Sequence, residues 1–212
     1  MIDYSLYLVT DRPLAKGRST REIVEAAVAG GVTCVQLREK ECSTREFIAE
    51  ALALKPLLKA KNIPLIINDR IDVALAVEAD GVHLGQQDME LETARKICRK
   101  GLLIGISAES VEDARRAEEQ GADYIGISPV FATPTKTDTG SPLGLEGVAK
   151  IRELVDIPLV GIGGINQQNA AAVIAAGADG VAVVSAIVAA DDPAASARTL
   201  RTIIAQAAGR KR

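Results

Sequence analysis

Residues 174–184, IAAGADGVAVV, carry the pattern that decides the fold. An apolar helical segment reaches a glycine turn, and a short aliphatic run follows. The same order of helix end, turn and strand recurs in VAGGVTCVQL (28–37), VEADGVHL (77–84) and EEQGADYIGI (118–127). Glycine suits the end of a helix because it tolerates positive φ. An aspartate or a threonine precedes each new strand. We interpret these segments as the bottom turns of a repeated unit, serving stability more than chemistry.

Beyond these turns, short aliphatic runs alternate with helical patterns along the whole chain. The expected strands are 5–10, 33–38, 64–69, 80–85, 102–107, 123–128, 158–163 and 179–185. The expected helices are 19–28, 44–61, 71–78, 91–99, 111–119, 145–154, 167–176 and 193–208. Ser19 with Glu22 has capping-box spacing, and Pro56 is expected to kink or end its helix.

The number of strands distinguishes two α/β architectures. A doubly wound sheet would also alternate strands with helices, but it usually has fewer strands in a chain of this length. Several runs are almost continuously hydrophobic, as strands covered on both faces tend to be. Eight strands and eight helices therefore predict a closed (β/α)8 TIM barrel, with residues 1–212 as a single domain.

Composition narrows the class of function. The chain has 212 residues, 48% of them hydrophobic and only 2% aromatic, which predicts an aliphatic core and argues against a stacking surface for nucleic acid. The net charge of −3 argues against a general polyanion-binding surface. We expect no membrane span and no signal peptide, because no apolar run is long enough to cross a membrane and the first strand is not preceded by a basic region and an apolar run. Cys34, Cys42 and Cys98 lack metal-ligand spacing, so we expect reduced thiols in a cytoplasmic protein.

Polar residues follow the strands, where barrels of this kind place their active sites. Arg38, Lys40 and Lys136 are cations on this rim. Lys136 lies in PVFATPTKTDTG (129–140), a long hydroxyl-rich connection with almost nothing to bury. Asp69 and Asp88 end adjacent strands, which run about 5 Å apart. Two carboxylates at such a short distance favour a magnesium ion, which takes oxygen ligands from side chains and from substrate phosphate. We therefore expect a diphosphate site.

A second anion site is expected after the last two strands, in GIGGI (161–165) and VVSAI (183–187). Loops at these two positions frequently bind phosphate through backbone N–H groups. Gly163 and Gly164 would allow close approach of the backbone, and Ser185 would add a hydroxyl.

Each feature also has a structural interpretation without chemistry. The glycines could serve turn geometry alone, residues 38–41 could be a solvated run of charges, and Asp69 could cap the helix that follows it. His83, the only histidine, is as compatible with a hydrogen-bonded core residue as with a catalyst. The functional interpretation is favoured because the features cluster at one end of successive strands.

The motifs YLVTD, VQLREK, NDR, DGVHLGQQD, GIS, GISPVFATPTKTDTG, GIGGI and GVAVVSAI, in this order from about residue 7 to 187, resemble the thiamine-phosphate synthase (thiamine-phosphate pyrophosphorylase) family. The resemblance implies a (β/α)8 barrel that joins hydroxymethylpyrimidine diphosphate to thiazole phosphate and releases pyrophosphate. It also implies these roles: Arg38, Lys40, Asn68, Ser107 and Lys136 on the diphosphate; Asp69 and Asp88 on Mg2+; Gln36, Thr133 and Thr135 beside the pyrimidine and thiazole phosphate; Gly164, Val184 and Ser185 on the thiazole phosphate. Arg38, Lys40, Ser107 and Lys136 would be the catalytic group.

One residue departs from the family pattern. The family commonly has SAH after the fifth strand, and this chain has SAE, with Glu109. The related thiazole tautomerases, an alternative on the same barrel, use that histidine as an acid and base, so its absence argues against them. A non-catalytic regulator that binds thiazole phosphate is a second alternative, but it would not need the paired aspartates and Lys136. The sequence leaves the oligomeric state open, and a homo-oligomer is compatible with it.

Overall fold

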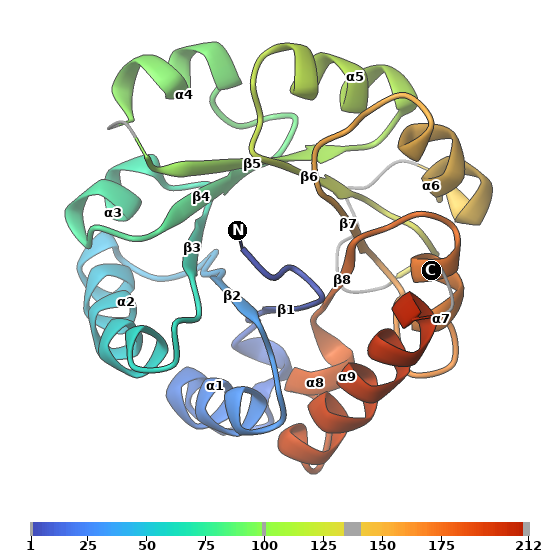
Figure 1. Ribbon diagram of the computed structural model, residues 1–212. Coiled ribbons are helices and arrows are strands. Elements are labelled where there is room, and N and C mark those ends of the chain that lie inside the picture. Colours follow the sequence, from blue (N-terminus) through green and yellow to red (C-terminus); the bar gives the residue numbers. More distant parts are fainter. Residues whose placement is uncertain (1, 99–100, 134–140, 210–212) are drawn as a thin grey trace.

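The computed structural model describes residues 2–98, 101–133 and 141–209. Within them, parallel strands close into a barrel in chain order, from β1 to β8 and back to β1. The strands are β1 (Leu6–Val9), β2 (Cys34–Leu37), β3 (Leu65–Asn68), β4 (Gly81–Leu84), β5 (Leu103–Ala108), β6 (Tyr124–Ile127), β7 (Leu159–Ile162) and β8 (Gly180–Val183). Figure 1, which looks into the ring of strands, shows the helices packed around its outside. The predicted (β/α)8 barrel is confirmed.

Helices lie close to their expected positions. They are α1 (Thr20–Ala29), α2 (Thr44–Lys59), α3 (Ile71–Ala76), α4 (Leu91–Ile97), α5 (Val111–Glu119), α6 (Gly144–Arg152), α7 (Ala170–Ala175), α8 (Ser185–Val188) and α9 (Pro193–Gly209), with a short 3-10 helix η1 (Pro13–Ala15). The sequence did not predict η1 or α8. The capping box of Ser19 and Glu22 is confirmed, and α2 continues through Pro56 to Lys59. The expected end of α4, at residue 99, lies outside the described residues. No helix in the described ranges is long and apolar enough to cross a membrane.

The residue before each repeated strand binds the start of the strand before it. The Asp179 side chain accepts a hydrogen bond from Leu159 N at 2.8 Å, which ties the turn before β8 to the first residue of β7. The equivalent bonds are Asp80 with Leu65 N at 2.8 Å, Asp123 with Ile104 N at 2.7 Å, and Thr33 with Leu6 N at 3.1 Å. The repeat seen in the sequence is therefore a set of side-chain bonds that joins β1 to β2, β3 to β4, β5 to β6 and β7 to β8.

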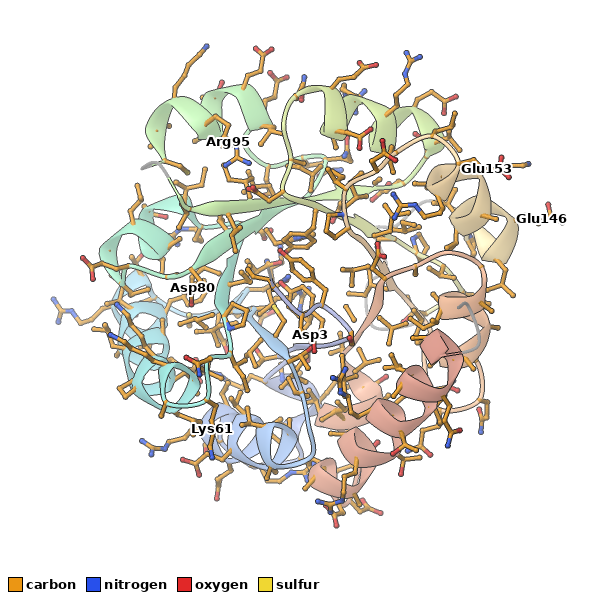
Figure 2. The ribbon with its side chains drawn as sticks, viewed as in Figure 1. Asp3, Lys61, Asp80, Arg95, Glu146 and Glu153 are labelled. Carbon is orange, nitrogen blue, oxygen red and sulfur yellow. The ribbon has the colours of Figure 1, made fainter. Side chains whose placement is uncertain are left out.

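These bonds lie on the face of the barrel shown in the figures. Asp80 lies beside β3 and β4, and Arg95 reaches from α4 towards β5 (Figure 2). Arg95 pairs with Asp123 at 2.5 Å, and Arg152 pairs with Asp179 at 3.0 Å. The arginines hold the carboxylates on the strand N–H groups, and the opposite ends of the strands stay available for chemistry.

The core has two layers of different composition. Between the sheet and the helices it is aliphatic, as predicted. Inside the barrel it contains all three tyrosines of the chain, Tyr4, Tyr7 and Tyr124, and the rings of Tyr4 and Tyr124 are 4.7 Å apart. Gly105 makes room for them, because a Cβ there would lie 2.1 Å from the Tyr124 ring. The prediction of a mostly aliphatic core is thus confirmed, and the tyrosines of the barrel interior are the feature that it did not include.

The bond between Asp123 and Ile104 can be tested by Asp123→Ala. The change leaves the N–H of fully buried Ile104 without its side-chain acceptor and removes the ion pair with Arg95. We expect the free energy of unfolding to fall by about 1 to 2 kcal/mol, measured by urea denaturation. Asp191→Ala is the control, because that carboxylate is 98% exposed and its ion pair with Lys16 should contribute little. Equal stability of the two variants would contradict the role given to Asp123.

Candidate active site

A cavity of about 250 Å³ lies at the C-terminal ends of the strands. Its lining includes these residues from the sequence prediction: Gln36, Arg38, Lys40, Asn68, Asp69, Asp88, Ser107, Thr133, Gly164, Val184 and Ser185. Thr135 and Lys136 lie outside the described residues. The barrel thus brings together every predicted site residue that the structure describes.

The two predicted metal ligands face each other beside a lysine. Lys40 Nζ lies 2.6 Å from Asp69 Oδ2, and Asp88 accepts a hydrogen bond from Gly85 N at 2.7 Å. Burial, and then the adjacent Asp69 side chain, raise the pKa of Asp88, while Gly85 N–H and Lys40 act in the opposite direction. The pair therefore carries more negative charge than Lys40 alone balances, which is the environment that attracts a cation.

Asp69 does not cap the helix that follows it. The residue at the N-cap of α3 is Arg70, and it makes no side-chain capping bond. Asp69 itself has a φ of 62°, in the left-handed region, and its N–H donates to His83 O at 2.8 Å. Such a backbone is uncommon for a residue with a side chain and is often found at functional sites.

Arg38 is held by an acid that the sequence analysis did not assign to the site. Arg38 Nη1 lies 3.1 Å from Asp11 Oδ2, and Arg38 N donates to Thr10 Oγ1 at 2.9 Å. Asp11 follows β1 and Arg38 follows β2, so adjacent strands bring them together. The sequence did contain a signal for this pair, because an acidic residue follows the first strand and a basic residue follows the second.

A chain of hydrogen bonds crosses the floor of the cavity. Gln36 Nε2 donates to Tyr7 OH at 3.0 Å, and Tyr7 OH lies 2.9 Å from Tyr124 OH. His83 Nδ1 lies 2.9 Å from Tyr124 OH, and His83 Nε2 lies 2.9 Å from Ser107 Oγ. His83, left open between two interpretations, is thus both hydrogen-bonded and part of the cavity lining. The sequence analysis did not place Tyr7 and Tyr124 in the site. The pattern of a strand indicates which of its residues are buried, but not which side chains on other strands they bind.

The direction of this chain follows from its first member. A Gln amide nitrogen can only donate, so Tyr7 accepts a hydrogen bond from Gln36 and donates its own O–H to Tyr124. Burial raises the pKa of both tyrosines well above the ordinary value, so both keep their protons at neutral pH. Tyr124 then donates to His83 Nδ1, and His83 Nε2–H donates to Ser107 Oγ. Ser107 is left with a hydroxyl proton that can point into the cavity.

The glycines after β7 have a packing role as well as a place in the lining. Gly163 and Gly164 have φ values of 100° and 64°. A Cβ on Gly163 would lie 2.7 Å from Pro129 Cβ, and one on Gly164 would lie 2.7 Å from Ala132 O. The interpretation as turn glycines is therefore confirmed, and the absent side chains also make room for the segment after β6. The expected close approach to a phosphate stays a prediction. Ser185 begins α8, directly after β8.

Comparison with known proteins agrees with this geometry. A family model described as thiamine monophosphate synthase matches residues 6–187 of the chain. The chain belongs to the thiamine monophosphate synthase family.

Relatives and solved structures support this membership. The chain is 55% identical to a thiamine-phosphate synthase of Chloroflexus aurantiacus, over 96% of this chain and 94% of the relative. It is 58% identical to that of Albidiferax ferrireducens, over 94% and 91% of the two chains. A solved thiamine phosphate pyrophosphorylase from Pyrococcus furiosus has a TM-score of 0.90 and 42% identity, covering 97% of each chain. A 3-hexulose-6-phosphate synthase structure, with a TM-score of 0.72 and 19% identity over 94% of this chain and 99% of the other, shares the fold alone.

Glu109, the departure from the family pattern, is among the residues that line the cavity. Its backbone N–H donates to Asp113 at 3.3 Å, which ties the start of this loop to α5. The three cysteines are free thiols, as expected.

The interpretation of residues 38–41 as a solvated run of charges is wrong for Glu39. Its side chain is 5% exposed and lies 3.2 Å from Arg12 Nη2, which also contacts Glu50 of α2 at 2.7 Å. Burial, and then the neighbouring Glu50 carboxylate, raise the pKa of Glu39 to about 7. Glu39 is therefore a buried acid between two cavity-lining cations.

This raised pKa predicts a pH-dependent stability. The folded protein keeps a proton on Glu39 that the unfolded chain releases above the ordinary value of 4.5. Stability should therefore fall as pH rises from about 4.5 to 7 and lose no more from this group above that range. Glu39→Gln should remove this loss, so its advantage over wild type in urea denaturation should grow across the window. Glu41→Gln, in an exposed neighbour, should follow the wild type. A constant difference between Glu39→Gln and wild type would contradict the burial of a titrating carboxyl.

Proposed function

We propose that this chain condenses hydroxymethylpyrimidine diphosphate with thiazole phosphate to give thiamine phosphate and pyrophosphate. The observation that carries the proposal is that a single cavity is lined by Arg38, Lys40, Asp69, Asp88 and Ser107. Cations alone would suit many anions, whereas cations together with paired carboxylates suit a diphosphate that arrives with a metal ion. The curated relatives, which carry the name thiamine-phosphate synthase, support the same activity.

We propose Mg2+ as the cofactor, held by Asp69 and Asp88. Among the described residues there is no cluster of three or more His, Cys, Asp or Glu side chains that could hold a metal by itself. Two carboxylates fit magnesium nonetheless, because this ion usually keeps several waters and takes further oxygens from substrate phosphate. When bound, Mg2+ would neutralise charge on the departing diphosphate.

The side chains of the site would act on the same leaving group. Arg38 and Lys40 neutralise the diphosphate, Asn68 donates an amide hydrogen bond, and Ser107 donates the hydroxyl proton that its contact with His83 leaves available. Lys136, from the segment outside the described residues, completes this set in the proposal, and Thr135 of the same segment would lie beside the pyrimidine and thiazole phosphate. The electron-rich aminopyrimidine supports a developing carbocation, so the bond to the diphosphate breaks before the new bond forms.

The thiazole nitrogen then attacks the carbon that the diphosphate has left. This nitrogen has a free lone pair, so no general base is required. The carbon–oxygen bond breaks with its electron pair on pyrophosphate, and the carbon–nitrogen bond forms. Gln36 and Thr133 would orient the rings, while Gly164, Val184 and Ser185 would hold the thiazole phosphate. Excluding water from the closed cavity protects the cation from hydrolysis.

The alternatives differ in what they require of the site. A thiazole tautomerase needs an acid and base, and the family histidine for that role is Glu109 here. A regulator that only binds thiazole phosphate needs no Asp69–Asp88 pair. We also propose a cytoplasmic location, consistent with the free thiols.

The direct test is to incubate the protein with both substrates and Mg2+ and to analyse the products. We expect thiamine phosphate and pyrophosphate in equal amounts. Binding of thiazole phosphate without turnover would favour the regulator, and isomerisation of a thiazole substrate alone would favour the tautomerase.

Asp88→Asn tests the metal assignment. The amide keeps an oxygen that can accept from Gly85 N, so the fold should be unchanged, but the carboxylate charge is lost. We expect kcat to fall by about a hundredfold or more, with partial recovery at high Mg2+ concentration. Asp72→Asn, in an exposed carboxylate paired with Arg70, is the control and should be active. Wild-type activity of Asp88→Asn at low Mg2+ would show that Asp88 does not hold the metal.

Ser185→Ala tests the division into two anion sites. A contact with a phosphate remote from the reacting bond should affect KM more than kcat. The variant should raise the KM for thiazole phosphate and leave the KM for the pyrimidine diphosphate unchanged, in steady-state assays that vary one substrate at a time. An equal rise in both KM values would refute the partition.

A further inference from the structure

The segment that carries Arg38 and Lys40 has an acidic residue between them that faces the other way. Arg38 and Lys40 line the cavity, and Glu39 is absent from the lining formed by the described residues. Glu39 therefore points behind the cavity wall, where its side chain is 5% exposed.

Three segments of the chain meet at Glu39. Arg12 lies on the connection after β1, Glu39 on the connection after β2, and Glu50 on α2. One guanidinium nitrogen, Arg12 Nη2, contacts both carboxylates, at 3.2 Å and 2.7 Å. Cys42 lies at the edge of this cluster, and burial, and then the Glu39 charge, raise the pKa of its thiol.

Stability alone gives a poor reason for this arrangement. Glu39 Oε1 is buried and receives no hydrogen bond from any residue in the described part of the chain. Two carboxylates share one guanidinium, and burying a charge with incomplete partners costs free energy. A well-packed apolar side chain would serve stability at least as well. The best-attested use of a buried ionic group is to fix one geometry among several.

Arg38 and Lys40, which flank Glu39, need a backbone that is held in one position. Arg38 is paired with Asp11 and Lys40 with Asp69 at the ends of their side chains. A diphosphate and its metal ion would compete for the same charged groups, so the ion pairs of Arg38 with Asp11 and of Lys40 with Asp69 must change as substrate binds. The contacts of Glu39 lie behind the wall and need not change.

We propose that Glu39, through its contact with Arg12, is a positioning residue that fixes the backbone from which Arg38 and Lys40 reach the diphosphate. The inference rests on the proposed function and deepens it, since it assigns a role to a residue that touches no substrate. The length of the Glu39 side chain, which lets it contact Arg12, matters more for holding this backbone in place than its charge does.

A pair of variants separates reach from charge. Glu39→Asp keeps the carboxylate but is one methylene too short to hold Arg12 in place. Glu39→Gln keeps the length and an acceptor oxygen but removes the charge. We expect Glu39→Asp to weaken binding of inorganic pyrophosphate with Mg2+ by about tenfold in calorimetry, and to raise the KM for the pyrimidine diphosphate in parallel. Its KM for thiazole phosphate should be unchanged, and Glu39→Gln should recover most of the lost affinity.

Glu41→Asp and Glu41→Gln are the matched controls, since Glu41 lies in the same segment with an exposed side chain. Pyrophosphate binding in both should equal that of the wild type. The inference is overturned if Glu39→Asp binds pyrophosphate normally, if it raises both KM values equally, or if Glu39→Gln is the more impaired of the two.

Two further outcomes are separable. If the wild type forms no thiamine phosphate, the proposed function fails, whereas a fully active wild type with an unimpaired Glu39→Asp overturns this inference alone. If Glu39→Asp does not melt cooperatively, Arg12→Lys takes its place, because lysine keeps the charge but lacks the planar guanidinium that holds both carboxylates. Normal pyrophosphate binding by Arg12→Lys would then count against the proposal.

Discussion

The hydrogen bond from Leu159 N to the Asp179 side chain, repeated at Asp80, Asp123 and Thr33, is the constraint on which the rest of the structure depends. A closed barrel requires every strand to keep its register, because a shift of one residue would turn the interior side chains outward. Each bond ties the start of one strand to the residue that precedes the next. With the bottom ends fixed, the top ends meet in one ring, and the residues that follow them share one cavity.

The interior of the barrel transmits this order to the site. Tyr7 and Tyr124 fill the space below the cavity and also carry hydrogen bonds from Gln36 to His83. Gly105 allows this, since any side chain there would overlap the Tyr124 ring. One layer of side chains therefore supports the barrel and orients Ser107. Above that layer, the carboxylates of Asp69 and Asp88 leave a negative charge that Lys40 only partly balances, and on this imbalance rests our proposal of a metal ion that accompanies a diphosphate.

The fold could be predicted from the sequence because helix ends, glycine turns and aliphatic runs are local signals that recur at regular intervals. The placement of Arg38, Asp69 and Ser107 could be predicted for a similar reason, since parallel strands bring residues at their C-terminal ends together. Other features depend on contacts between distant segments. Glu39 looks like one charge among several until Arg12 and Glu50 are seen around it. Likewise, nothing local marks Tyr124 as a partner of Tyr7, which lies 117 residues away, and α8 is too short to leave a periodic signal.

The central claim is that the carboxylate pair admits a diphosphate only together with Mg2+. The most direct measurement is a calorimetric titration of inorganic pyrophosphate into the protein with and without Mg2+, corrected for the association of the two ions in protein-free solution. The account predicts that Mg2+ strengthens pyrophosphate binding and that pyrophosphate strengthens Mg2+ binding by the same factor, because coupling between two ligands is reciprocal. Pyrophosphate affinity that is the same with and without Mg2+ would contradict it.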